Sequence, residues 1–143
     1  MNLEMIFSAC NMLAILGWLA LTLAPLQRSY CISFARGIAL ILAVSYILQL
    51  IFITEHVEGG GFMTLAGVNA LFGKAGNVMM GWTHYLAFDL FIGSWATEDA
   101  AAQGLPHWLL IPCLLLIFLF GPIGLLLYFI IRTIKRQTVK PAL

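Results

Sequence analysis

Long apolar stretches alternate with short polar ones along the chain. Apolar runs cover residues 3–24 and 108–131, and each exceeds the about 20 residues that a helix needs to cross a membrane. A third run, 32–53, can also cross the membrane if Arg36, near its start, extends its guanidinium group back to the headgroups. A fourth, 78–95, holds polar residues among aromatic and aliphatic ones. The pattern predicts four transmembrane helices.

The polar segment between the second and third helices has a pattern of its own. Three consecutive glycines at residues 59–61 end any helix, and the sequence FMTLAGVNALFG that follows is typical of a short interfacial or re-entrant helix. We therefore expect an all-α fold: an integral membrane bundle of four transmembrane helices with this short helix between the second and the third. It forms a single transmembrane domain over residues 1–143, with a basic tail at 132–143.

Composition agrees with this interpretation. Hydrophobic residues make up 62% of the chain and charged residues 9%, whereas ordinary soluble domains contain about 25% charged residues. The first run lacks the basic n-region and cleavage site of a signal peptide, so we expect it to be retained. With no transit peptide ahead of it, the chain is expected to be a multi-pass protein of a bacterial inner membrane. The three cysteines have no metal-type spacing and are expected to be small packing residues.

The basic residues predict an orientation. With four spans, both termini and the long loop share one side. That side then holds five basic residues, Lys74, Arg132, Lys135, Arg136 and Lys140, and the other side holds two, Arg28 and Arg36. The excess predicts that both termini are cytoplasmic, although a fifth crossing through 62–77 would reverse the sides. The stripe at 132, 135 and 136 indicates contact with anionic lipid headgroups and not with nucleic acid.

Two ionisable residues stand inside the third run, GWTHYLAFDLFIGSW at 81–95. A charged Asp at the bilayer centre costs about 2.5–3.5 kcal/mol on insertion scales, so Asp89 is expected to face other helices and to be functional. The alternative for Asp89 and His84 is a hydrogen bond that only holds helices together. On a helix the two residues are about 140° apart. Each should therefore meet a different neighbour, or both should border one wide cavity, and Tyr85 is the nearest partner for the carboxylate.

Other features have simpler explanations. Trp82, Tyr85 and Asp89 share one helix face, and His84, Phe88, Phe91 and Trp95 share another. Glu98 and Asp99 follow at the interface, where solvated carboxylates are common. His107 caps or anchors the last helix, and His56 belongs to a polar turn or to a loop metal site. Pro122 and Gly124 are expected to kink the last helix and to let another helix approach closely.

The sequence resembles the membrane family related to the plant abscisic-acid-deficient-four protein, and it is most similar to the bacterial-type members. The shared pattern is W-x-H, then D-L-F, then a late P-x-G, which here are Trp82, His84, residues 89–91, Pro122 and Gly124. The specific motifs lie within 81–128, and the arrangement of four spans extends the similarity over essentially the whole chain. Plant members are implicated in making neoxanthin from violaxanthin.

The resemblance implies acid–base isomerisation of a carotenoid or another isoprenoid-type lipid. Turning an epoxide end group into an allene requires a base that removes a proton and an acid that helps to open the epoxide, with no net redox change. The resemblance makes His84 the base and Asp89 the acid, or the reverse. We expect seven residues to bind the ligand: Trp82, Tyr85, Phe88, Phe91, Asp99, Pro122 and Gly124.

Other functions stay open at this point. One is a non-catalytic scaffold or helper for a carotenoid enzyme. Another is a small proton-coupled carrier, which would oligomerise to enclose a pathway. A b-type haem would need one axial histidine, or two from facing helices, which His84 with His107 or His56 could supply. A di-iron oxygenase would need more histidines than the chain has. We expect membrane lipids, an isoprenoid-type ligand and a homo-oligomer as partners, and neither a metal nor a cofactor.

Overall fold

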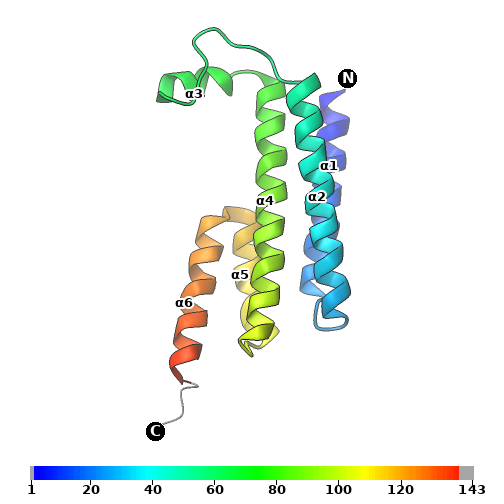
Figure 1. Cartoon of the computed structure of the whole chain (residues 1–143), viewed down its shortest axis with the longest axis vertical. Coiled ribbons are helices and arrows are strands. Elements are labelled where there is room, and N and C mark those ends of the chain that lie inside the picture. The colour runs from blue at the N-terminus through cyan, green and yellow to red at the C-terminus, as the bar shows by residue number, and fades with distance from the viewer. Residues whose placement is uncertain (1, 139–143) are drawn as a thin grey trace.

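The computed structural model describes residues 2–138 of the chain, and the side chains of residues 2–135. All regular secondary structure in this part is helical, which confirms the all-α prediction. Helices α1, α2 and α4 run side by side, with α4 in the centre of the molecule (Figure 1). The helices are α1 Leu3–Thr22, α2 Arg28–Phe52, α3 Leu65–Leu71, α4 Ala75–Ala102, α5 His107–Phe120 and α6 Pro122–Thr138.

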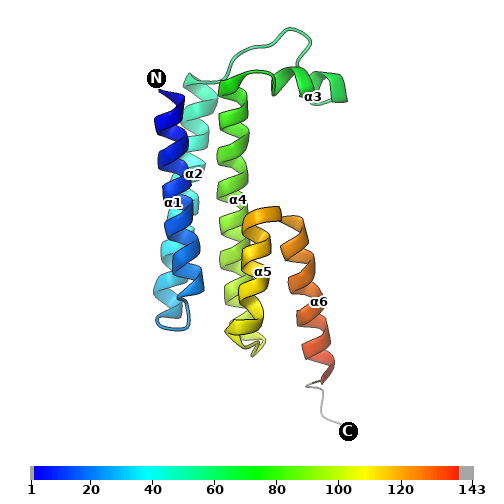
Figure 2. The same cartoon turned by 180° about the vertical axis from the view of Figure 1, so that it is seen from behind.

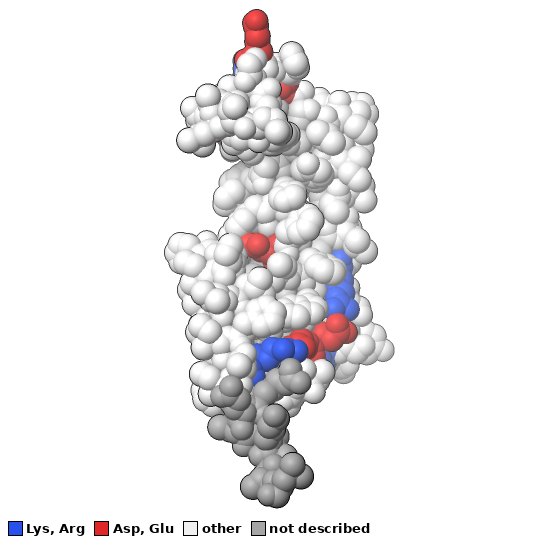
Figure 3. Space-filling view, turned by 60° about the vertical axis from the view of Figure 1, so that its left-hand side comes forward, with Lys and Arg blue, Asp and Glu red and all other residues white. Residues whose placement is uncertain are grey.

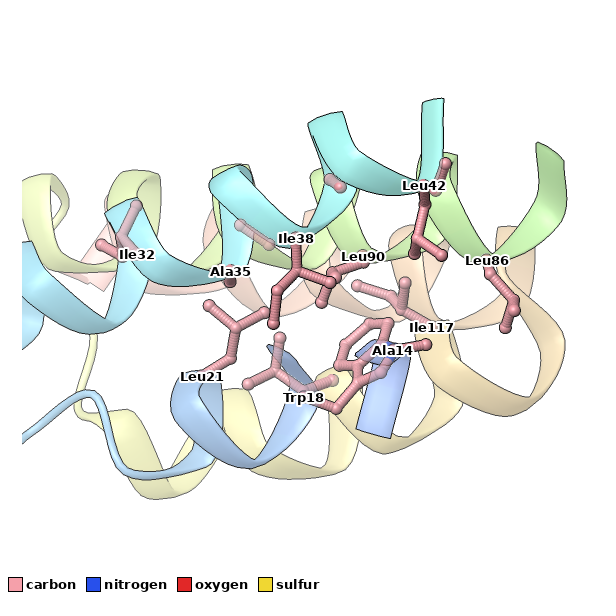
Figure 4. Packing of buried hydrophobic residues seen from close by; sticks show 14 of the residues in the cluster. Ala14, Trp18, Leu21, Ile32, Ala35, Ile38, Leu42, Leu86, Leu90 and Ile117 are labelled. Atoms are coloured by element: carbon pink, nitrogen blue, oxygen red, sulfur yellow. The ribbon is translucent and has the colours of Figure 1, made fainter. Parts of the chain in front are cut away.

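Small residues let α1 and α4 pack closely. A Cβ atom added at Gly17 would lie 2.6 Å from Leu90 Cδ2, and one added at Gly93 would lie 2.7 Å from the Trp18 ring. Figure 4 shows Trp18, Leu90 and Ile38 converging between α1, α4 and α2. Interiors are close-packed. These contacts therefore fix the position of α4 against α1 and α2.

A buried polar cluster joins the same three helices. The Gln49 amide donates to Ser45 Oγ at 3.0 Å and to Thr83 Oγ1 at 3.0 Å, and Cys10 Sγ lies 3.7 Å from Ser45 Oγ. Buried polar groups within apolar helices are stabilised by such mutual hydrogen bonds. Cys10 is thus an unpaired, buried packing residue, as predicted for it, and Cys113 is another.

The apolar run at 108–131 forms two helices, so the prediction of one helix over this range is wrong. Helix α5 ends at Phe120, Gly121 adopts a φ of +36°, and α6 begins at Pro122. A positive φ favours glycine, and proline cannot continue a helix but readily starts one. Figure 2 shows the result: α5 runs back along half of α4, and α6 reverses direction to form a hairpin with it.

The hairpin changes the placement of the chain ends. The start of α1 and the loop that contains α3 lie at one end of the bundle, and α6 runs toward the other end (Figure 2). The sequence-based prediction that both termini lie on one side assumed that the last apolar run crosses the membrane. Because this run turns back, the two ends of the described chain lie at opposite ends of the molecule.

The surface between the two ends is apolar. Helices α1 and α2 are long and apolar enough to cross a membrane. Figure 3 shows uncharged surface between the charged groups at the α3 end and an acidic group at mid-height, with basic and acidic groups gathered from there toward the other end. The short helix expected after the glycines is present as α3, with Phe62, Met63 and Leu65 at its start 78%, 95% and 85% exposed. Such exposure is typical of an element that meets lipid.

Candidate functional site

Asp89 lies midway along α4, against the tip of the α5–α6 hairpin. A Cβ atom added at Gly121 would lie 3.0 and 3.1 Å from the two carboxylate oxygens of Asp89. Asp89 Oδ2 is buried and has no hydrogen-bond partner among the described residues. A buried, unpartnered carboxylate oxygen is costly in an apolar environment and marks a functional site by default.

Tyr85 lies one helical turn before Asp89, on the same face of α4. Its hydroxyl donates to the Phe118 carbonyl at 2.7 Å, and this satisfies one of the carbonyls left free at the end of α5. The hydroxyl lies close to the Asp89 carboxyl group, one turn further along α4. Tyr85 therefore connects the hairpin to Asp89, as its position in the sequence predicted for the carboxylate partner.

Trp82 continues this face toward the end of the molecule that carries α3. The Trp82 ring lies 5.3 Å from the Tyr85 ring and donates from Nε1 to Asn11 Oδ1 at 3.1 Å. It also lines a pocket of about 490 Å³ between α1 and α4, with apolar walls that include Phe7 and a rim that includes Lys74.

Trp82, Tyr85 and Asp89 lie at successive turns on one face of α4, called here the Asp89 surface. The segment of α4 from Ala75, at the pocket, to Asp89 extends about 21 Å at 1.5 Å per residue. Its polar groups are concentrated at the Asp89 end and at the rim of the pocket.

His84 lies on a different face of α4. Its ring stacks on Phe88, with centroids 4.6 Å apart, and lies 5.7 Å from the Tyr46 ring of α2. The expectation that His84 and Asp89 meet different neighbours is therefore confirmed. Because the two side chains point about 140° apart around the helix, the structure does not bring them together as a pair that acts on one reacting group.

The other aromatic residues of the predicted site lie on the His84 side of α4 and not on the Asp89 side. Phe88 and Phe91 are exposed and line a shallow pocket of about 240 Å³ between α2 and α4. Trp95 packs at the level of α6, with its ring 5.7 Å from that of Phe129. Of the predicted ligand-binding residues, only Trp82 and Tyr85 therefore share the surface that carries Asp89.

Asp99, predicted to bind ligand, anchors the hairpin to α4. Arg132 donates to both carboxylate oxygens, from Nε at 2.6 Å and from a terminal nitrogen at 3.1 Å, and the Tyr128 hydroxyl makes a further short hydrogen bond. The interaction with Arg132 holds the pKa of Asp99 below its usual range. Arg132, expected at lipid headgroups, is thus engaged inside the protein; the side chain of Arg136 lies outside the described part.

A second ion pair joins α2 to α4 nearby. Arg36 donates to Glu98 at 2.5 Å and to Ser94 Oγ at 3.3 Å. The sequence predicts that Arg36 reaches the lipid headgroups and that Glu98 is solvated, whereas in the structure the two pair with each other. Figure 3 shows acidic and basic groups side by side near this end of the molecule.

Pro122 and Gly124 shape the hairpin and do not line the Asp89 surface. Pro122 starts α6, and a Cβ atom at Gly124 would lie 2.1 Å from the Ile117 backbone nitrogen. The predicted close approach at Gly124 is therefore confirmed, and the neighbour is α5. The kink predicted at Pro122 is a complete reversal of the chain.

The remaining histidines have separate surroundings. His107 Nε2 lies 3.1 Å from the Thr22 carbonyl oxygen, so it anchors α5 to the end of α1 as expected. His56 lies in the loop after α2. Among the described residues, no group of three or more His, Cys, Asp or Glu side chains is arranged to hold a metal ion.

The ion pair at Asp99 should contribute measurably to stability. Arg132→Gln is expected to lower the melting temperature, because the substitution removes the hydrogen bonds of the guanidinium group to both oxygens of the Asp99 carboxylate. Because the pKa of Asp99 lies below its ordinary 3.8 in the folded state, this contribution is complete above that pH and is lost as the pH falls through the lower folded value.

Thermal melting in detergent micelles at pH 7 and at about pH 2 measures both effects. The difference between wild type and Arg132→Gln should be present at neutral pH and absent in acid. Arg36→Gln is the matched control, since Glu98 is 56% exposed and exposed pairs contribute no more than about 1 kcal/mol. Equal losses for the two variants at pH 7 would contradict the anchoring role.

Sequence reasoning missed several structural residues. Gln49 is a polar residue inside a predicted transmembrane helix. This is the criterion that identified Asp89, and it would have identified Gln49 as well. Asn77 donates to the Glu55 and Leu71 carbonyls and accepts from the Glu55 amide. The adjacent Gly121 and Pro122 are a recognised signal for a helix end.

The comparisons with known proteins give one match. The family described as ABA DEFICIENT 4-like matches residues 5–128, a range that holds α1 to α5 almost entirely and the first turns of α6. All the motif residues from Trp82 to Gly124 lie within it. No curated protein and no solved structure matches the chain.

Proposed function

The chain belongs to the ABA DEFICIENT 4-like family, and from this premise we propose that it is a membrane enzyme for acid–base isomerisation of a carotenoid or another isoprenoid-type lipid. The observation that carries the proposal is the buried, unpartnered oxygen of Asp89 next to the Tyr85 hydroxyl. The apolar pocket that Trp82 lines lies about two turns before Asp89 on α4 and suits the apolar chain of such a ligand.

In this proposal α1, α2 and α4 cross the bilayer, with residues 78–95 of α4 in the hydrocarbon layer. The α5–α6 hairpin enters from one side and returns to it. α5 has 14 residues, which at 1.5 Å per residue extend about 21 Å, too short to span. A turn of the backbone at membrane depth is tolerated where protein covers it, and the turn at Gly121 packs on Asp89.

This arrangement predicts the orientation of the protein. Five basic residues belong to the end where α6 points, Arg28, Arg36, Arg132, Lys135 and Arg136, and one, Lys74, belongs to the other end. Lys140 lies outside the described residues. Since cytoplasmic segments are enriched in Lys and Arg, we expect α6 to end in the cytoplasm and α1 to begin on the opposite side.

Two reporter fusions test this orientation. Alkaline phosphatase inserted at Gly59, in the loop before α3, should be active outside the cytoplasm. A green fluorescent protein fused after Leu143 should fluoresce, because it folds in the cytoplasm. An arrangement with four complete spans puts the loop and the C-terminus on one side, so reporters that agree on one side would contradict the hairpin.

The chemistry follows from the two groups at the hairpin tip. Asp89 as carboxylate removes a proton from the carbon that becomes part of the new double bond, and the carbon–oxygen bond of the epoxide breaks. The Tyr85 hydroxyl turns from Phe118 to the leaving oxygen and donates its proton to it. Transfer of the proton from Asp89 to Tyr85 restores both groups, so the product is an isomer of the substrate and no electrons are exchanged.

One observation favours a second candidate function, a proton-coupled carrier. Discontinuous helices that meet near the bilayer midplane beside an ionisable residue are typical of secondary transporters, and the α5–α6 turn lies against Asp89 in this way. A carrier would move a solute without changing it. An isomerase would change the host's lipids in the absence of any proton gradient.

Profiling the lipids and pigments of the native host, with and without this protein, tests the proposal. We expect one compound to be replaced by another of the same mass and different chromatographic retention. Vesicles that contain the purified protein and the replaced compound should give the same conversion with the proton gradient collapsed. An unchanged profile, or a conversion that stops when the gradient is collapsed, would contradict the isomerase.

A further inference from the structure

A second pocket lies under the loop that joins α2 to α4. Its volume is about 420 Å³, within the range of small-molecule sites. Helix α2 contributes Leu50, α4 contributes Met80, and the loop contributes Thr54, Glu55 and His56. Further apolar lining comes from Val57, Phe62, Leu71 and Phe72.

Asn77 gives this pocket a fixed shape. Its Oδ1 accepts from the Glu55 amide at 2.9 Å, and its Nδ2 donates to the carbonyls of Glu55 at 3.0 Å and Leu71 at 2.9 Å. Lys74 pairs with the Glu55 carboxylate at 3.6 Å. Both ends of the loop are thus tied to the start of α4, and a preformed site binds with a smaller entropic cost.

Two polar side chains of the pocket can meet a ligand: the His56 ring, and the Glu55 carboxylate, which also pairs with Lys74. The Glu55 carboxylate and the His56 ring are exposed, and no hydrogen bond within the described part of the chain engages the His56 ring. A carboxylate only accepts hydrogen bonds, whereas an imidazole donates from one nitrogen. A hydroxyl group matches either partner, because it can donate to Glu55 or accept from His56. A phosphate or carboxylate headgroup would be repelled by Glu55.

The apolar walls indicate the rest of the ligand. Phe62, at the mouth of the pocket, is 78% exposed, and the neighbouring outer faces of α2 carry exposed leucines and isoleucines. We propose that this pocket binds the hydroxyl end of a neutral single-chain amphiphile, a long-chain alcohol, whose chain lies along α2 in the bilayer. The site is separate from Asp89, since Trp82 and Tyr85 lie on another face of α4.

Photolabelling of the full chain in detergent micelles tests this site. The probe is hexadecanol that carries a diazirine on its chain. We expect labelled peptides from segments 50–57 and 71–80, with labelling displaced by excess hexadecanol and not by excess hexadecanoic acid. Glu55→Gln combined with His56→Phe should weaken this labelling about five- to tenfold, the effect of losing one or two hydrogen bonds.

Three controls separate the possible causes of a change. Lys74→Gln removes the ion pair and keeps both polar groups, so labelling should be retained. Asp89→Asn should leave labelling unchanged, because Asp89 lies outside this pocket. A failure of the proposed function at Asp89 therefore does not affect the test of the pocket. Melting temperatures show whether the double variant is folded. Labelling spread evenly over the lipid-facing helices, or equal displacement by the acid and the alcohol in the wild type, would overturn the proposal.

Discussion

Asp89→Asn should reduce the conversion of the host compound by at least about a hundredfold, the lower range of what a positioned acid or base contributes. The amide has almost the same size as the carboxyl group, so packing against Gly121 should be preserved. It cannot take up a proton near neutral pH. The variant should therefore be folded and inserted at normal yield, with a melting temperature close to that of wild type. Product formation and thermal melting, measured on the same preparation, check the two halves of this expectation.

Two matched variants make the result specific. Asp99→Asn changes another carboxyl group on α4 and should lower the melting temperature while conversion continues, because Asp99 binds Arg132. His84→Gln should leave conversion largely intact, since His84 stacks on Phe88 away from Asp89. An Asp89→Asn variant that melts early and still makes product would show that Asp89 only holds the hairpin. Loss of conversion in His84→Gln would support the pairing that the family resemblance implied.

The hydrophobic pattern predicted the helices that depend on local sequence. The runs at 3–24 and 32–53 correspond to α1 and α2, and the segment after the glycines contains α3. The run at 108–131 was predicted as one helix because apolarity measures affinity for lipid and contains no information on direction. The reversal depends on the positive φ of Gly121. The signal for it in the sequence is the pair of Gly121 and Pro122 in the middle of the run.

The part of the candidate site that lies on a single helix was predictable from the sequence. Helical spacing predicted that Trp82, Tyr85 and Asp89 share a face, and that His84 points elsewhere. The partners of Asp99 were not predictable, because Arg132 reaches it only after the hairpin has folded back on α4. The buried position of Asp89 Oδ2 likewise depends on Gly121, which is distant in sequence.

Gly124→Ala should disrupt the hairpin, although it adds a single methyl group. A Cβ atom at this position would lie 2.1 Å from Ile117 N, 2.5 Å from Leu116 C and 2.7 Å from Cys113 O. All three are backbone atoms of α5, so no side-chain rotation can relieve the overlap. The two helices must move apart, at a cost of about 3 kcal/mol or more, the upper range of overpacking effects. Because the hairpin tip covers Asp89, conversion should fall together with the melting temperature.

Gly37→Ala is the matched control for this substitution. Gly37 also lies inside a helix, α2, but a Cβ atom there has nothing within 4 Å. Alanine is favoured over glycine in a helix interior by about 1 kcal/mol, so Gly37→Ala should melt at the same temperature as wild type or slightly higher and keep full conversion. The two variants differ only in what surrounds the added methyl group. If Gly124→Ala also melts like wild type, α6 does not pack directly on the backbone of α5, and the turn that places Gly121 against Asp89 would lose its physical basis.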